Sequence, residues 1–181
     1  MSYPKTLEQL TESAKAAFEK NNYSEAARIF LHLRDQIDPV QQPLEYAEVS
    51  NNLSVAFLKD GRPQAALDAV IGTDAVFANY GQKTLQAMAL GNIGAALTDL
   101  QRFDEALSHY QQSAAIFEET GSKELRGYVM EQISVVQMKR GKQVESLFAM
   151  DAALQSRKAH TWREVILKKL MTIVHRRLKT G

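Results

Sequence analysis

Apolar residues recur along this chain at spacings of three and four positions, and short polar segments interrupt the pattern at regular intervals. Such spacing is typical of amphipathic helices, whereas half-buried strands alternate at every second residue. Ala, Leu, Glu, Gln and Lys, which favour helices, are abundant, and the sequence contains only four prolines. The pattern therefore predicts an all-α protein.

The helical pattern repeats every 40 residues, four times along the chain. A fixed period of this kind is typical of stacked supersecondary units. Two columns of the repeat hold small residues, a third holds large apolar residues, and a fourth holds residues expected in a turn. In that order the columns are Ala26, Ala66, Ala106 and Ser146; Ala14, Ser54, Gly94 and Ser134; Phe30, Val70, Tyr110 and Met150; and Asn21, Gly61, Gln101 and Gly141.

Each unit is expected to fold as two helices joined by a short turn. In the third unit the spacing predicts a first helix over about 84–100 and a second over about 104–119. Asp104 is a suitable N-cap for that second helix, as Ser24 is in the first unit. Gly121 suits the left-handed conformation that ends many helices.

Small and large residues alternate between the two helices of the third unit. Gly94 and Ala106 allow the two backbones to approach closely, while Phe103 and Tyr110 fill the space beside them. The first unit keeps most of this pattern, whereas the turn aromatic is absent from the second and fourth. The pattern resembles the tetratricopeptide repeat, and the residues of the third unit that carry the resemblance are Leu90, Ile93, Gly94, Leu97, Phe103, Ala106, Tyr110 and Ser113.

The resemblance implies a right-handed α-solenoid of about four tetratricopeptide helix-turn-helix repeats with a C-terminal capping helix. The whole chain, 1–181, is then a single domain. The commonest period of the family is about 34 residues, so the extra residues are expected to lengthen the second helix and the following loop. The repeats are expected at about 7–43, 44–83, 84–123 and 124–160, and the capping helix at about 161–179.

The resemblance also implies a binding surface, because the first helix of each repeat lines the concave face in this family. A column of amides falls there, Asn52, Asn92 and Gln132, which can donate to and accept from the backbone of an extended peptide. The same amides can instead bridge neighbouring helices. The expected groove residues are Asn51, Asn52, Val55, Leu58, Lys59, Asn92, Ala95, Thr98, Gln132, Val135 and Lys139, with Asp99 beside them.

Charge narrows the range of expected ligands. The net charge is +1, so no overall field favours nucleic acid or a membrane. The groove column of Glu19, Lys59, Asp99 and Lys139 alternates in sign, which suits a protein ligand better than a polyanion. No Lys or Arg occupies the groove positions of the third unit, so a clamp for a C-terminal carboxylate, known from some members of the family, is not expected.

Candidate catalytic and metal-binding groups are scattered. The absence of cysteine excludes disulfides and thiolate sites, and the four histidines occupy unrelated positions. No phosphate-binding or hydrolase motif occurs. We therefore predict a non-catalytic protein with no metal and no cofactor. No apolar signal core or run of about eighteen apolar residues occurs, which predicts no transmembrane segment and a cytoplasmic location.

The C-terminal segment differs from the rest in its charge. Residues 156–181 contain eight basic residues and one acidic residue, a net charge of +7, so the remainder of a chain whose total is +1 carries −6. A helix here can be a solvated cap, can pair with a second subunit in a homodimer, or can bind an anionic membrane or an acidic partner. The residues expected to make such contacts are Leu167, Lys168, Met171, His175, Arg176 and Leu178.

These inferences together predict a non-catalytic protein-interaction module that binds a peptide segment of a partner in its concave groove. Two alternatives remain open. One is a self-assembling structural subunit that dimerises through the C-terminal helix. The other is a regulatory sensor of a small peptide.

Overall fold

The computed structural model describes residues 6–156, and within this range the chain forms helices and no strand. The all-α prediction is confirmed. The helices are α1 (Leu7–Glu19), α2 (Tyr23–Arg34), α3 (Pro43–Lys59), α4 (Pro63–Val70), α5 (Thr73–Asn79), α6 (Lys83–Asp99), α7 (Phe103–Glu119), α8 (Lys123–Lys139) and α9 (Gln143–Ser156).

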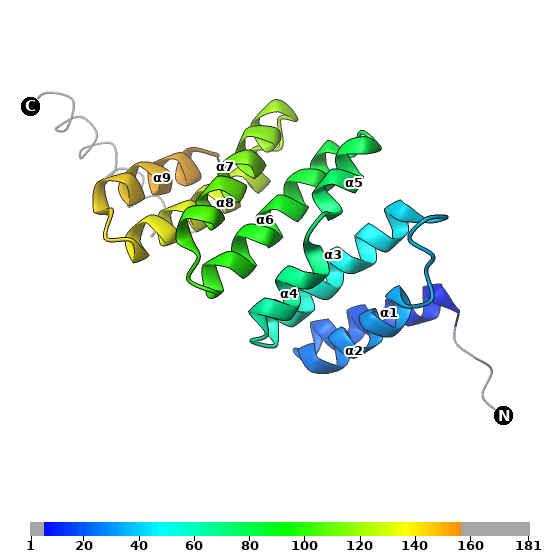
Figure 1. Cartoon of the computed structure of the whole chain (residues 1–181). Coiled ribbons are helices and arrows are strands. Elements are labelled where there is room, and N and C mark those ends of the chain that lie inside the picture. Colours follow the sequence, from blue (N-terminus) through cyan, green and yellow to red (C-terminus); the bar gives the residue numbers. More distant parts are fainter. Residues whose placement is uncertain (1–5, 157–181) are drawn as a thin grey trace, which may run out of the picture.

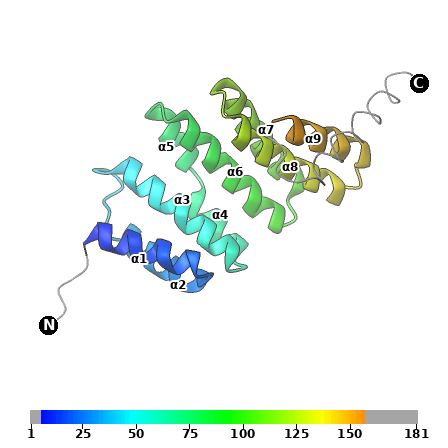
Figure 2. The same ribbon diagram turned by 180° about the vertical axis from the view of Figure 1, so that it is seen from behind.

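Successive helices pack against one another from one end of the molecule to the other (Figures 1 and 2). They form four hairpins, in which α1, α3, α6 and α8 are the first helices and α2, α4, α7 and α9 the second. One continuous hydrophobic core runs through the stack, from Leu10 in α1 to Ala149 in α9. The described part of the chain is therefore a helical solenoid, as expected, in which each hairpin buries its apolar face against its neighbours.

The turn inside each hairpin has the same backbone geometry. Its central residue is left-handed in all four units, with φ of 57° at Asn21, 73° at Gly61, 60° at Gln101 and 73° at Gly141. In the third unit the Arg102 amide then donates to the Leu97 carbonyl at 2.8 Å, which closes a Schellman motif. Equivalent bonds occur in the other units, so the predicted turn column is confirmed.

Gly121 is left-handed as predicted, with a φ of 69°. The two N-cap predictions are wrong, because each Schellman turn leaves only one residue before the next helix. The second helices begin at Tyr23 and Phe103, so Ser24 and Asp104 lie in the first turn. Asn22 is the N-cap of α2 and accepts from the Glu25 amide at 3.3 Å. The Asp104 carboxylate instead accepts from Arg140, at 2.5 Å.

The predicted close contact in the third hairpin is present. A Cβ placed on Gly94 would lie only 2.8 Å from Cδ1 of Tyr110. Ala106 is fully buried, and Tyr110 is 2 % exposed. In the fourth unit two serines occupy the small-residue columns, with the hydroxyl oxygens of Ser134 and Ser146 2.9 Å apart. The absence of a side chain at residue 94 is therefore what admits the tyrosine ring.

The units accommodate their extra residues in three different ways. In the first unit α2 is short, and residues 35–42 form the loop to α3. In the second unit the expected single helix is broken at Ile71 and Gly72, where Gly72 has a φ of 84°, and a separate helix α5 follows. In the third unit α7 is simply long. The expectation of a lengthened second helix thus holds for the third unit and is wrong for the first and second, whereas the expected longer loop is present in the first unit.

Two other expectations concern the C-terminal capping helix and the absence of a transmembrane segment. The predicted capping helix, about 161–179, lies outside the described residues, as do Leu167, Lys168, Met171, His175, Arg176 and Leu178. Within residues 6–156, none of the helices combines the length and the apolar character that a membrane span requires.

Substitution of the contact glycine tests the hairpin packing. We expect Gly94→Ala to lower the free energy of unfolding by about 1–3 kcal/mol, because the new methyl group overlaps the buried Tyr110 ring. Gly91→Ala is the matched control, since its Cβ would meet only Ser113 Oγ at 3.6 Å. The control should raise the free energy by about 0.5–1 kcal/mol through helix propensity. Urea unfolding followed by circular dichroism measures both, and equal effects would contradict the packing.

Substitution by alanine should change the free energy of unfolding in opposite directions at two serines of the small-residue columns, Ser54 and Ser146. Ser54 Oγ is buried and has no hydrogen-bond partner among residues 6–156, so Ser54→Ala should raise the free energy of unfolding by about 1 kcal/mol. Ser146 Oγ donates to the Ser134 carbonyl at 2.9 Å and lies beside the Ser134 hydroxyl. Ser146→Ala should lower the free energy by about 1–2 kcal/mol, because it leaves that hydroxyl unpaired. A stabilising Ser146→Ala would show that the pair contributes nothing.

Candidate functional site

The first helices of the four hairpins share a face that is hollowed by three adjoining cavities. We call this face the groove. A cavity of about 250 Å³ at its N-terminal end is lined by Lys15, Phe18, Glu19, Phe30, Asn52 and Val55. A central cavity of about 360 Å³ is lined by Val55, Leu58, Lys59, Asn92, Ala95, Thr98, Asp99, Tyr110 and Gln132. A third, of about 250 Å³, is lined by Ala87, Met88, Gly91, Asn92, Ala95, Tyr110, Phe117, Leu125, Tyr128, Val129 and Gln132.

The three cavities form one continuous surface because neighbours share lining residues. Val55 belongs to the first and the central cavity, and Asn92 and Gln132 belong to the central and the third. Most residues expected in the groove are thus brought together by the structure. Val135 and Lys139 do not line these cavities but are exposed on α8, one and two turns beyond Gln132.

Asn51 has a different position from the one expected. Its side chain is buried, and its Oδ1 accepts a hydrogen bond from Nδ2 of Asn92 at 3.0 Å. Asn51 therefore joins α3 to α6 and does not open onto the groove. The reason is its place on the helix, because adjacent residues point about 100° apart and only Asn52 faces the cavities.

The three amides of the predicted column are not equivalent. Asn52 and Gln132 are exposed, and neither side chain makes a hydrogen bond within residues 6–156. Asn92 is half-buried and uses one N–H on Asn51, which leaves its oxygen and its second N–H. The sequence left bridging between helices and binding of a ligand as alternatives for these amides. In the structure Asn92 bridges two helices, while Asn52 and Gln132 remain available for a ligand.

Tyr110 forms part of the floor of the central and third cavities, although it comes from a second helix. Its ring reaches the groove because Gly94 leaves space in front of it. Burial raises the pKa of Tyr110 to about 12, and the nearby Asp99 charge acts in the same direction, while an interaction with Thr98 opposes it. The phenol therefore stays protonated at neutral pH.

Thr98 also has a largely structural position. It is buried, and its hydroxyl donates to the Gly94 carbonyl at 2.8 Å. Sequence reasoning placed Thr98 in the groove and treated Tyr110 only as a packing residue. The available signal was the pair of Gly94 on the first helix and Tyr110 on the second, because a glycine leaves room for the ring to line the groove.

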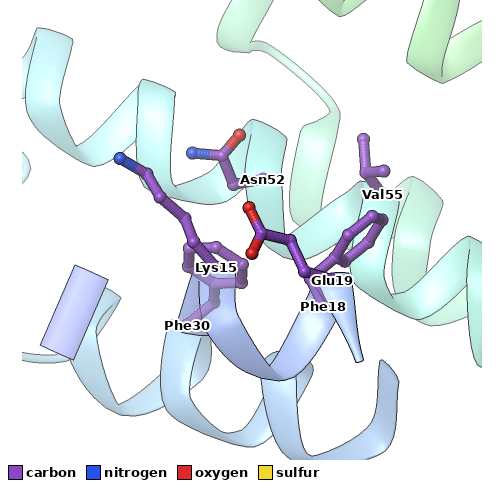
Figure 3. Close-up of a pocket in the computed structure, with 6 residues that line it drawn as sticks. All are labelled: Lys15, Phe18, Glu19, Phe30, Asn52 and Val55. Atoms are coloured by element: carbon purple, nitrogen blue, oxygen red, sulfur yellow. The ribbon is translucent and has the colours of Figure 1, made fainter. Parts of the chain in front are cut away.

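The N-terminal cavity combines charged and aromatic side chains (Figure 3). Lys15 and Glu19 extend from α1 toward the opening that Asn52 faces from α3. Phe18 and Phe30 complete the lining. Lys15 also pairs with Glu12 at 3.0 Å in an exposed position, where such a pair contributes little to stability.

Among the apolar residues that line the groove, sequence reasoning missed two whose side chains are exposed. Met88 and Tyr128 line the third cavity, and their exposed fractions are 43 % and 49 %. Each lies one helical turn before a predicted groove amide, Asn92 or Gln132. That four-residue spacing was the available signal, since residues four apart share a helix face.

Histidine and carboxylate side chains do not gather into a metal site within residues 6–156. His32 lies 2.9 Å from the Gln36 side chain on the exposed side of α2, and His109 is half-buried in α7. His160 and His175 lie outside the described residues.

The groove and its stacked hairpins define a class of helical-repeat protein with an open face. The tetratricopeptide repeat family matches residues 85–159, which include most of α6 and all of α7, α8 and α9. This match supports a tetratricopeptide repeat protein. Such repeats generally mediate protein–protein interactions, and the family is typically non-catalytic. No curated protein sequence matches the chain significantly.

The Asn51–Asn92 bond should be measurable as a stability contribution separate from binding. Asn51→Ala is expected to lower the free energy of unfolding by about 1–2 kcal/mol, because it leaves Asn92 without its partly buried acceptor. Asn52→Ala, at an exposed position one residue away, should change it by less than about 0.5 kcal/mol. A double-mutant cycle between Asn51 and Asn92 that shows no coupling would contradict the bridge.

Proposed function

We propose that the protein is an interaction module that binds an extended segment of a partner protein along the groove. The observation that carries this proposal is the continuity of the three cavities, which extend over α1, α3, α6 and α8 and share lining residues on α3, α6 and α8. A peptide is the ligand that suits such a surface, because it can occupy several small cavities in succession with alternate side chains.

The exposed amides supply a way to hold the peptide backbone. Asn52 and Gln132 each offer an acceptor and two donors, and neither is engaged within residues 6–156. Asn92 adds its remaining oxygen and N–H between them. Contacts of this kind hold a backbone without reading its sequence, so Val55, Ala95, Val135, Lys59 and Lys139 are the residues that would contribute selectivity.

The alternatives differ in where they place the function. Dimerisation through the C-terminal helix depends on residues that lie outside the range 6–156 that the structure describes. A sensor of a small peptide would use the same groove and would differ only in the length of the ligand. The continuity of the cavities over four helices supports a longer segment.

A random library of twelve-residue peptides, selected on the full chain, tests the groove directly. We expect selected peptides to slow hydrogen exchange in α3, α6 and α8. We also expect Asn52→Ala and Gln132→Ala each to raise their Kd about 3- to 10-fold, because each removes one or two hydrogen bonds to the ligand.

The control is Gln111→Ala, an exposed amide on the second helix α7. It should leave the Kd unchanged. If selected peptides bind all three variants equally, or protect only the second helices from exchange, the groove is not the binding surface and the proposal is wrong.

A further inference from the structure

The groove presents four side-chain positions on each first helix, and each position recurs every 40 residues. They follow the spacing i, i+4, i+7 and i+11, which keeps one face of a helix. Most of these residues line the three cavities. The positions are Glu8, Glu12, Lys15 and Glu19 on α1; Glu48, Asn52, Val55 and Lys59 on α3; Met88, Asn92, Ala95 and Asp99 on α6; and Tyr128, Gln132, Val135 and Lys139 on α8.

The C-terminal half of this face is apolar at its first and third positions. The first position is Met88 on α6 and Tyr128 on α8, and both line the third cavity. Val135 adds a further exposed apolar side chain on α8. Large apolar side chains grouped around a cavity on the surface are typical of a binding site, because their burial by a ligand is favourable.

The N-terminal half of the same face is acidic on balance, because its four glutamates outnumber its two lysines, Lys15 and Lys59. The first position is here Glu8 on α1 and Glu48 on α3, in place of the apolar residues of the later units. Glu8, Glu19 and Glu48 are exposed, and none of them forms an ion pair within residues 6–156. Glu12 is paired with Lys15. Exposed carboxylates that form no ion pair with the other described residues attract a cationic ligand.

We propose that the partner segment carries a large apolar side chain that enters the third cavity, between Met88 and Tyr128, and basic side chains that lie along α1 and α3. This inference rests on the proposed function of the groove. It assigns the ligand a chemical class and an arrangement: an apolar anchor at one end and Lys or Arg at the other.

The spacing between anchor and basic residues follows from helix packing. Directly packed helices lie about 8–10 Å apart. Successive first helices pack mainly on the second helices between them, so two steps along the groove span at least about 20 Å. An extended chain advances about 3.3 Å per residue, so the basic residues of the ligand are expected about six or more positions from the apolar anchor.

The composition of peptides selected from the random library tests this assignment. We expect Leu, Met or an aromatic residue at one position, Lys or Arg enriched at least about twofold roughly six or more positions away, and depletion of Asp and Glu. Selection on Met88→Ala should lose the apolar preference and keep the basic one.

Charge reversal tests the acidic end. In the double variant Glu19→Lys, Glu48→Lys the selected peptides should bind about tenfold more weakly at low salt, and the difference should shrink at high salt through screening. Glu145→Lys, an exposed carboxylate on the second helix α9, is the matched control and should have little effect.

Three results would overturn the inference. Peptides that bind the groove without basic enrichment would refute it while leaving the proposed groove function intact. Peptides that bind elsewhere would refute both. A synthetic peptide of residues 157–181 that binds the groove more tightly than any selected peptide would make this chain's own basic segment the occupant in place of a partner.

Discussion

The close approach of the two helices in each hairpin is the constraint on which the rest of the structure depends. It requires small residues where the helices meet, and the structure has them in every unit, all buried: Ala14 and Ala26, Ser54 and Ala66, Gly94 and Ala106, and Ser134 and Ser146. Once the two backbones are close, the large residues beside them fill the space to the next hairpin and extend one core through the stack. The orientation of the first helices, and so the groove, follows from this contact.

Packing and groove shape are coupled most directly at Gly94. Because this residue has no side chain, the ring of Tyr110 both seals the hairpin core and forms the floor of two cavities. The same residue pair thus sets the stability of the third hairpin and the depth of the groove in front of it. A buried residue of the core thus also forms part of the floor of these two cavities.

The parts of the fold that repeat were predictable from the sequence, because the same physical requirement recurs at a fixed spacing. The hairpins, the left-handed turn column and the small-residue contact are all of this kind. The mispredicted parts have two different causes. The break at Gly72 depends on a single residue that the other units do not share. The helix start at Phe103 recurs in every unit, but it depends on how the Schellman turn closes, which the spacing of apolar residues does not specify.

The candidate site was predictable to the same extent as the fold, at the positions that repeat. Residues on the groove face were predicted by their column, and most of them line the cavities. The inward position of Asn51 was not predicted. The family pattern specifies the groove face only to within one residue, and a step of one residue turns a side chain by about 100° around the helix. Its bond to Asn92 also needed the relative position of two helices, which no single helix pattern contains.

Differences between the units carry information about function for the same reason. At the packed columns the four units keep small or large residues as the fold requires. At the first groove position they do not: Glu8 and Glu48 are acidic, whereas Met88 and Tyr128 are apolar. Hairpin packing does not demand this change, since these four side chains are exposed. A repeat that holds its buried positions constant and varies its exposed ones along the stack gives each end of the groove its own chemistry, and a ligand that contacts both ends can bind in one direction only.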